Sequence, residues 1–172
     1  MPRLKTTLKI CLGFLVLGLA FSTLAASQTQ LETQLPLRVE VKTYPSRIGA
    51  GQEAWIAVAI ALDEGWHIYG NPKGPGPGLP TILEVLSLPE GFRADAARFL
   101  PAEKLVEPDL RLDEWVWIYR KKTTIYLRLF TPSQLPFKKH QVRLHLQLAL
   151  CREGVCMPYK TELTVPLNVV ST

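Results

Sequence analysis

Hydrophobic and polar residues alternate along much of this chain, and the alternation predicts β-strands. Leu37, Val39 and Val41 are separated by charged residues, which is the period of two expected for a strand with one buried face. Further strand-like stretches, some of them continuous apolar runs, cover residues 55–62, 66–69, 81–88, 115–119, 123–130, 141–150 and 161–169. Turn-forming residues separate them, and no stretch has the pattern of a good amphipathic helix. We therefore expect an all-β protein that folds as an antiparallel β-sandwich.

Two segments between these strands are irregular. Residues 71–78 contain three prolines and three glycines, which excludes a helix and predicts a rigid surface loop. This loop lacks the strand–glycine–helix context of a phosphate-binding site. Residues 92–114 carry many charges and two prolines, and no regular element is predicted there.

The N-terminal segment has the layout of a secretory signal. Residues 1–9 are basic, residues 10–26 are almost entirely apolar, and residues 23–25 offer small side chains at alternate positions. We expect a signal peptide over residues 1–25, a flexible arm over 26–35 and one domain over 36–172. The alternative is an uncleaved anchor, because the apolar run is close to the minimum length for spanning a bilayer. Cys11 would leave with a cleaved signal.

Composition and charge exclude several classes of protein. The chain is 47% hydrophobic and 20% charged, which excludes a disordered or collagen-like chain. Its net charge of +5 first suggests nucleic acid, but three of the 20 basic residues lie within the first nine positions. The remaining 17 basic and 15 acidic residues give a body of mixed sign, so no nucleic-acid partner is expected.

Two cysteines remain after the signal, and the alternating pattern places them opposite each other. If Cys151 faces Cys156 across a hairpin, Leu150 faces Met157, and apolar residues also face each other at 148/159, 144/163 and 142/165. A shift of one residue would destroy these matches. Gly154 can adopt the positive φ that a tight turn requires. An exported protein can keep such a disulfide, and only one pairing is possible.

The pattern also predicts the surroundings of the disulfide. Cys151 shares a strand face with Arg143, His145 and Gln147, so we expect it on the polar side of the sheet, within reach of another protein's thiolate. A loop this short contributes only about 2 kcal/mol of chain-entropy stabilisation. From the residues alone, a structural and an exchange-active disulfide remain equally open.

Several motifs in this order resemble the N-terminal domain family of the thiol:disulfide interchange protein DsbD. The resemblance covers roughly residues 36–168. It is carried by Gly65-Trp66-His67-Ile68-Tyr69, Gly78-Leu79-Pro80-Thr81, Leu88-Pro89-Glu90-Gly91 and Cys151-Arg152-Glu153-Gly154-Val155-Cys156-Met157-Pro158. The resemblance implies an immunoglobulin-like sandwich in the periplasm and a thiol–disulfide oxidoreductase. Cys151 and Cys156 would take electrons from a membrane electron carrier and pass them to thioredoxin-like proteins, with Cys156 joining the partner and Cys151 resolving the mixed disulfide.

The resemblance also implies roles for residues outside the hairpin. Asp113, Glu114 and Trp115 match a cap loop that covers the cysteines until a partner arrives, and Tyr69 matches an aromatic residue near them. His67 stands where the best-known member has a tyrosine, and that member has one more residue between its cysteines. The acids could equally be solvated loop residues, and Trp115 could equally pack in the core, as we expect for Trp117 and Tyr119.

Other chemistries find little support in the sequence. Cys151, Cys156 and Met157 are soft ligands that could suit Cu(I). Zinc would need four ligands, and the sequence has no second cysteine or histidine pair with the required spacing. No metal and no cofactor is expected. His145 is expected to pair with Glu162 on the surface, and His140 to lie in a loop.

Two hypotheses remain. In the first, the chain is an exported, monomeric exchange protein; with no membrane or thioredoxin domain in this sequence, it would be a stand-alone version whose electron donor is a separate protein. In the second, it is a non-enzymatic binding module with a structural disulfide.

Overall fold

Alternate burial along the strands shows how the sequence builds two sheets. The computed structural model describes residues 35–106, 114–135 and 139–170. In β2 (Glu53–Leu62), Ala54, Ile56, Val58 and Ile60 are buried, while most residues between them are half-exposed. β9 (Lys122–Phe130) and the first half of β10 (His140–Arg152) repeat this pattern. Each strand therefore contributes one apolar face to a shared core.

The first sheet is antiparallel and has the order β1–β2–β9–β5, with β6 also paired to β9. Its strands are β1 (Leu37–Tyr44), β2, β9, β5 (Arg93–Ala94) and β6 (Arg98–Phe99).

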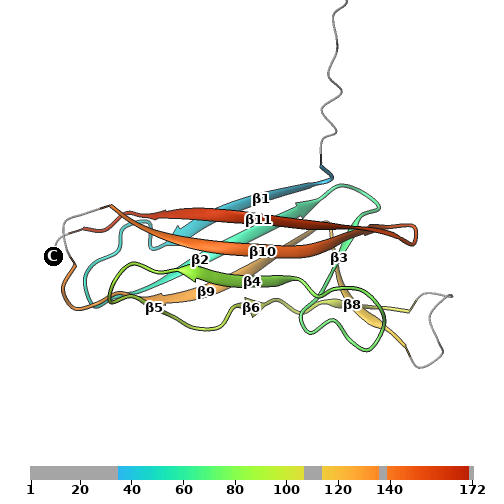
Figure 1. Cartoon of the computed structure of the whole chain (residues 1–172), viewed down its shortest axis with the longest axis horizontal. Coiled ribbons are helices and arrows are strands. Elements are labelled where there is room, and N and C mark those ends of the chain that lie inside the picture. Colours follow the sequence, from blue (N-terminus) through green and yellow to red (C-terminus); the bar gives the residue numbers. More distant parts are fainter. Residues whose placement is uncertain (1–34, 107–113, 136–138, 171–172) are drawn as a thin grey trace, which may run out of the picture. The chain divides into compact units, whose positions relative to one another are not determined.

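The second sheet has the order β11–β10–β3–β8–β7, with β4 also paired to β10. Its strands are β11 (Val155–Leu167), β10, β3 (His67–Tyr69), β8 (Val116–Arg120), β7 (Glu103–Leu105) and β4 (Ile82–Ser87). Figure 1 shows the long β10–β11 hairpin turning back at the same end of the domain as β3 and β8. This end holds the candidate site.

The core lies between the two sheets. Side chains from β2 and β9 pack with the inward face of β10, where Val142, Leu144, Leu146, Leu148 and Leu150 are all fully buried. A second, smaller cluster is formed by residues of β3, β8 and the end of β10: Tyr69, Val116, Ile118, Ala149 and Cys151. This second cluster includes one of the two paired cysteines.

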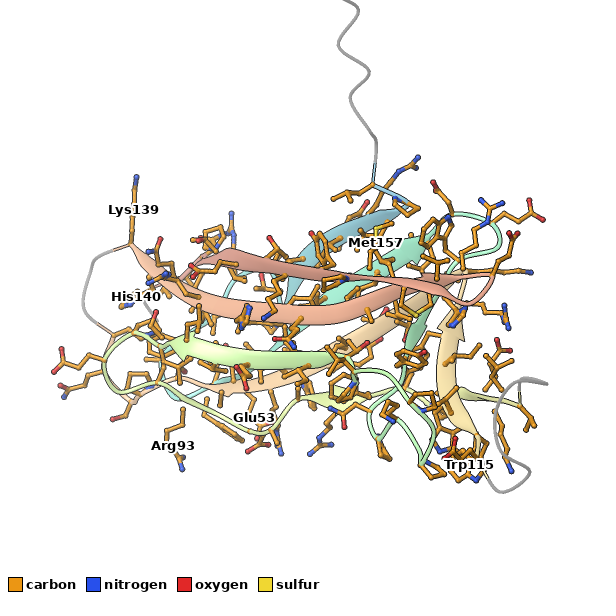
Figure 2. The ribbon with its side chains drawn as sticks, turned by 45° about the vertical axis from the view of Figure 1, so that its right-hand side comes forward. Glu53, Arg93, Trp115, Lys139, His140 and Met157 are labelled. Carbon is orange, nitrogen blue, oxygen red and sulfur yellow. A yellow bond between two sulfur atoms is a disulfide. The ribbon has the colours of Figure 1, made fainter. Side chains whose placement is uncertain are left out.

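The all-β prediction is confirmed, and each predicted stretch corresponds to a strand. The segment expected to be irregular contains three short strands, β5, β6 and β7. The prediction for His140 was wrong: it begins β10, is only 3% exposed, and its ring lies 5.4 Å from that of Phe92. Figure 2 shows His140 at the opposite end of the hairpin from Met157. Within the described ranges, no helix is long and apolar enough to cross a membrane. The predicted signal peptide and almost all of the predicted arm lie outside those ranges.

Candidate functional site: a disulfide with one buried and one exposed sulfur

A two-residue turn fixes the register of the cysteine hairpin. Glu153 and Gly154 both have positive φ, 51° and 77°, as a type I′ hairpin turn requires. The ladder continues to the pair Arg152↔Val155 and places Cys151 opposite Cys156. The predicted register is confirmed at all four apolar pairs, including Leu150↔Met157. Local turn chemistry and cross-strand matching therefore favour the same pairing.

The two cysteines form a disulfide but differ in exposure. Their sulfurs are 2.02 Å apart and their Cα atoms 4.1 Å apart. Cys156 is exposed, whereas Cys151 is only 1% exposed. The expectation that Cys151 lies on an open polar surface was therefore wrong. Only the sulfur of Cys156 is on an exposed residue that an incoming group could approach.

The cover over Cys151 comes from neighbouring strands. β3 pairs with β10 so that His67 lies opposite Cys151 and Ile68 opposite Leu150. Tyr69 and Ile118, from β3 and β8, join Cys151 in the second cluster. Alternation correctly assigned Cys151 to the outward face of β10, but at this end of the strand that face is covered. His67 and Tyr69 are both buried, at 5% and 9% exposure. His67 lies opposite Cys151 and the Tyr69 hydroxyl contacts Cys156, so the structure brings both predicted near-site aromatics to the disulfide.

Tyr69 makes the polar contact to the exposed cysteine. Its hydroxyl lies 3.7 Å from the Cys156 sulfur, and since a disulfide sulfur carries no hydrogen, the hydroxyl is the donor. The Tyr69 backbone carbonyl accepts a hydrogen bond of 2.5 Å from the Thr81 hydroxyl. Tyr69 is thus held through its backbone while its hydroxyl contacts the disulfide.

The glycine–proline loop packs closely on this site. A Cβ on Gly78 would lie 2.2 Å from the Tyr69 ring, and Gly78 has a φ of +103°. A Cβ on Gly74 would lie 2.8 Å from Trp115, and the Gly76 amide donates to the Trp115 carbonyl at 3.0 Å. The loop therefore holds Tyr69 and Trp115 through close backbone approaches that only glycine permits.

The predicted cap loop is only partly visible. Asp113 lies outside the described residues, while Glu114 and Trp115 come directly before β8 and are half-buried. Trp115 stacks edge-on against Trp117, with ring centroids 5.0 Å apart, and the Lys104 ammonium lies 4.8 Å from its ring centre. Figure 2 shows Trp115 at this edge of the domain. A shielding role for these residues stays a prediction.

Two exposed apolar residues flank Cys156 in the chain. Val155 is 70% exposed and Met157 37% exposed, one on each side of Cys156 in the chain, and Leu79 of the glycine–proline loop is also exposed. Sequence reasoning did not single out Val155 or Leu79 as site residues. Their positions in the sequence could have indicated them, because Val155 precedes Cys156 and Leu79 follows Gly78, the loop glycine that packs on Tyr69.

Arg152 and Tyr119 are two polar residues near the site whose side chains have partners in the structure. Arg152 contacts Glu153 at 3.4 Å, an exposed ion pair. Tyr119 points to the other side of β8, where its hydroxyl donates to the Leu100 carbonyl at 2.5 Å and burial raises its pKa. Its predicted packing in the core is confirmed, because it is only 6% exposed.

The predicted pairing of His145 with Glu162 was wrong. The two face each other in the ladder, but the His145 Nδ1 atom lies 3.8 Å from Glu84, and Glu162 pairs with Arg143 at 2.6 Å. β4 lies beside β10 here and supplies the competing carboxylate. Within the described ranges, no group of three or more His, Cys, Asp or Glu side chains could hold a metal ion.

Comparison with known families identifies the class of this domain. The family model described as thiol:disulfide interchange protein DsbD, N-terminal, matches residues 33–168. The chain therefore belongs to the DsbD N-terminal domain family, and its two packed sheets form the immunoglobulin-like sandwich expected for it. Family membership and the Cys151–Cys156 disulfide together support a role in thiol–disulfide exchange.

Several solved structures are similar to this chain. The reduced N-terminal domain of DsbD from Neisseria meningitidis is 16% identical, with 64% of this chain and 74% of that chain covered and a TM-score of 0.43. The N-terminal periplasmic domain of ScsB from Proteus mirabilis is 15% identical, with 77% and 46% covered and a TM-score of 0.46. A complex of the DsbD and PilB N-terminal domains from Neisseria meningitidis is 13% identical, with 74% and 80% covered and a TM-score of 0.45. No curated protein matches the chain.

Proposed function

We propose that this protein is an exported thiol–disulfide exchange protein. It takes electrons from a membrane electron carrier and passes them to thioredoxin-like proteins of the periplasm. The observation that carries this proposal is the asymmetry of the disulfide: Cys156 is exposed and Cys151 is buried behind it. Exchange requires one sulfur that a partner can reach and a second that is held back to resolve the mixed disulfide.

Each electron transfer to a partner takes two steps. The Cys156 thiolate attacks the partner's disulfide and forms a mixed disulfide. Cys151 then attacks the Cys156 sulfur, the internal disulfide forms, and the partner leaves as a reduced dithiol with both electrons. Val155 and Met157, on either side of Cys156 in the chain, are exposed apolar side chains at this end of the hairpin that a protein partner could cover.

Redox titration of the purified protein separates this function from a structural disulfide. Thiol labelling reports the two cysteines and circular dichroism reports the fold across glutathione and dithiothreitol buffers. The proposal predicts reversible reduction above about −300 mV with the β-sheet spectrum intact. Reduction at a lower potential, or only with loss of structure, would instead identify a binding module with a structural disulfide.

The cap-loop role of Asp113, Glu114 and Trp115 belongs to the same proposal. Glu114 and Trp115 directly precede β8, the strand next to β3 and its near-site residues. Replacing Trp115 by Ala should then raise the rate at which a small disulfide reacts with reduced Cys156. An unchanged rate in a folded variant would show that Trp115 only packs against its neighbours.

Export is the remaining part of the proposal. A cleaved signal over residues 1–25 would release the domain and its flexible arm into the periplasm. Fractionation of cells that express the full chain, with intact-mass measurement, tests this directly. A periplasmic product that begins after residue 25 supports the proposal, whereas a full-length product in the membrane fraction shows an uncleaved anchor.

A further inference from the structure

His67 occupies the position directly opposite the buried cysteine. The ladder between β3 and β10 pairs His67 with Cys151. Directly opposed residues of an antiparallel pair project from the same face, with Cβ atoms about 4.5–5.5 Å apart. Both residues are almost fully covered, at 5% exposure for His67 and 1% for Cys151. An imidazole therefore lies next to the sulfur that solvent reaches least.

Tyr69 connects His67 to the exposed cysteine. The rings of His67 and Tyr69 meet edge to face with centroids 5.9 Å apart. The Tyr69 hydroxyl in turn lies 3.7 Å from the Cys156 sulfur. The short strand β3 thus places His67 opposite Cys151, and it places Tyr69 in the same cluster as Cys151 with its hydroxyl at Cys156.

The resolving step requires that the Cys151 thiol lose its proton. Cys151 can attack only as a thiolate, and a thiol in apolar surroundings gives up its proton less readily than an exposed one. Because Cys151 is covered, the proton must pass to a protein group. Among protein side chains, a neutral imidazole is the one best suited to accept a proton near neutral pH.

The other titratable or charged groups around Cys151 are less suited to this transfer. Arg120, on the other side of His67, is ion-paired with Glu103 at 2.7 Å, and Arg152 is paired with Glu153. Other ionisable groups on the neighbouring elements include Asp63 and Glu64 before β3, Tyr69 on β3, Glu114 before β8 and Lys160 on β11. Guanidinium groups cannot accept a proton, phenol and ammonium groups have no free basic site at neutral pH, and a carboxylate is a weaker base than an imidazole.

We propose that His67 accepts the proton of the Cys151 thiol in the resolving step, an inference that rests on the proposed exchange function. Starting from the mixed disulfide, the imidazole takes the proton from the Cys151 sulfur. The resulting thiolate attacks the Cys156 sulfur, the Cys151–Cys156 bond forms, and the bond between Cys156 and the partner breaks. The partner sulfur leaves with both electrons of that bond, and the imidazolium releases its proton to that sulfur or to water.

The two steps can be measured separately with glutathione disulfide as the probe. Reduced protein is mixed with the probe, quenched in acid at short times, and analysed by intact mass, which distinguishes dithiol, glutathionylated and internally oxidised protein. We expect His67→Gln to accumulate glutathionylated protein, with resolution at pH 7 slowed about tenfold or more. Attack by Cys156 should change less than threefold in the same variant. The variant should also lose whatever part of the pH dependence of the resolution rate comes from ionisation of His67.

Two controls make the outcome decisive. His145→Gln removes a histidine from the same face of β10 further from the disulfide and should resolve at the wild-type rate. His67→Phe keeps a ring but has no proton acceptor, so it should resolve slowly, and it also serves as the test if His67→Gln does not fold. Wild-type resolution in a folded His67 variant, or equal slowing of both steps, would overturn the proposal. Failure of the wild-type protein to form any mixed disulfide would instead overturn the exchange function itself.

Discussion

The outward face of β10 follows one alternating pattern along its whole length, but one half of this face is open to solvent and the other half is buried. At one end, Arg143 is exposed and His145 and Gln147 are half-exposed. At the other end, Ala149 and Cys151 are buried, at 6% and 1% exposure. The difference comes from what lies over each half, because β3 and β8 supply Tyr69, Val116 and Ile118 only at the cysteine end. Alternation thus decides the face of a residue, while segments distant in sequence decide its burial.

This difference gives the disulfide its asymmetry. An uncovered face would leave both sulfurs accessible, as the alternation alone predicts. The cover takes Cys151 out of solvent and leaves Cys156, on the outer strand β11, exposed. The two bonded cysteines therefore differ in exposure, which is the asymmetry that the proposed exchange function uses.

The largest expected effect comes from placing a charge on each half. Ala149→Glu would bury an unpaired carboxylate and should lower the free energy of unfolding by about 3 kcal/mol or more. Gln147→Glu, two residues earlier on the same face and opposite Lys160, should change it by less than about 0.5 kcal/mol. Urea unfolding of both variants measures the contrast. Similar losses in the two variants would contradict a covered and an open half.

A smaller effect is expected from the loop that supports the cover. In Gly78→Ala, the new Cβ would meet the Tyr69 ring at 2.2 Å and the residue would keep a φ of +103°. Clash and backbone strain together should lower stability by about 2–4 kcal/mol. Gly154→Ala also has positive φ but meets nothing within 4 Å, so backbone strain alone should cost about 1 kcal/mol. Equal losses in urea unfolding would show that the loop does not hold Tyr69.

The smallest expected effect concerns the Tyr69 hydroxyl. Tyr69→Phe keeps the ring in the cover and removes the hydrogen bond to Cys156, so stability should fall by no more than about 1 kcal/mol. A thiolate accepts a stronger hydrogen bond than a disulfide sulfur, so reduced Cys156 should react several-fold more slowly with a small disulfide. Tyr119→Phe is the matched control, because its hydroxyl donates to the Leu100 carbonyl. Equal reaction rates in the two variants would show that the Tyr69 hydroxyl does not affect the reactivity of Cys156.

Much of the fold could be predicted because its information is local. The period of two placed the long strands, and matching apolar residues gave the β10–β11 register down to Cys151↔Cys156. His140 was misplaced because its burial depends on Phe92, a contact between residues far apart in the sequence. His145 was misassigned because Glu84 of β4 competes with the residue directly opposite it.

The site was predictable in membership but not in geometry. Cysteines, His67 and Tyr69 could be proposed from their motifs. The burial of Cys151 could not, because it requires β3 to pair with β10 and the glycine–proline loop to hold Tyr69. Both are long-range contacts that a single sequence does not record. The same contacts place His67 opposite Cys151, which turns an unexplained histidine into a candidate for proton transfer.

The reactivity of the two cysteines, each measured alone, tests the central claim most directly. In protein prepared without residues 1–25, Cys151→Ser leaves only the exposed thiol and Cys156→Ser only the buried one, and both folded variants are mixed with glutathione disulfide at pH 7. We predict that Cys156 reacts at least about tenfold faster than Cys151, because a covered thiol is less accessible and less readily ionised. In guanidinium chloride the two rates should become similar. Equal rates in the folded proteins, or a faster Cys151, would contradict an exposed attacking sulfur and a buried resolving one.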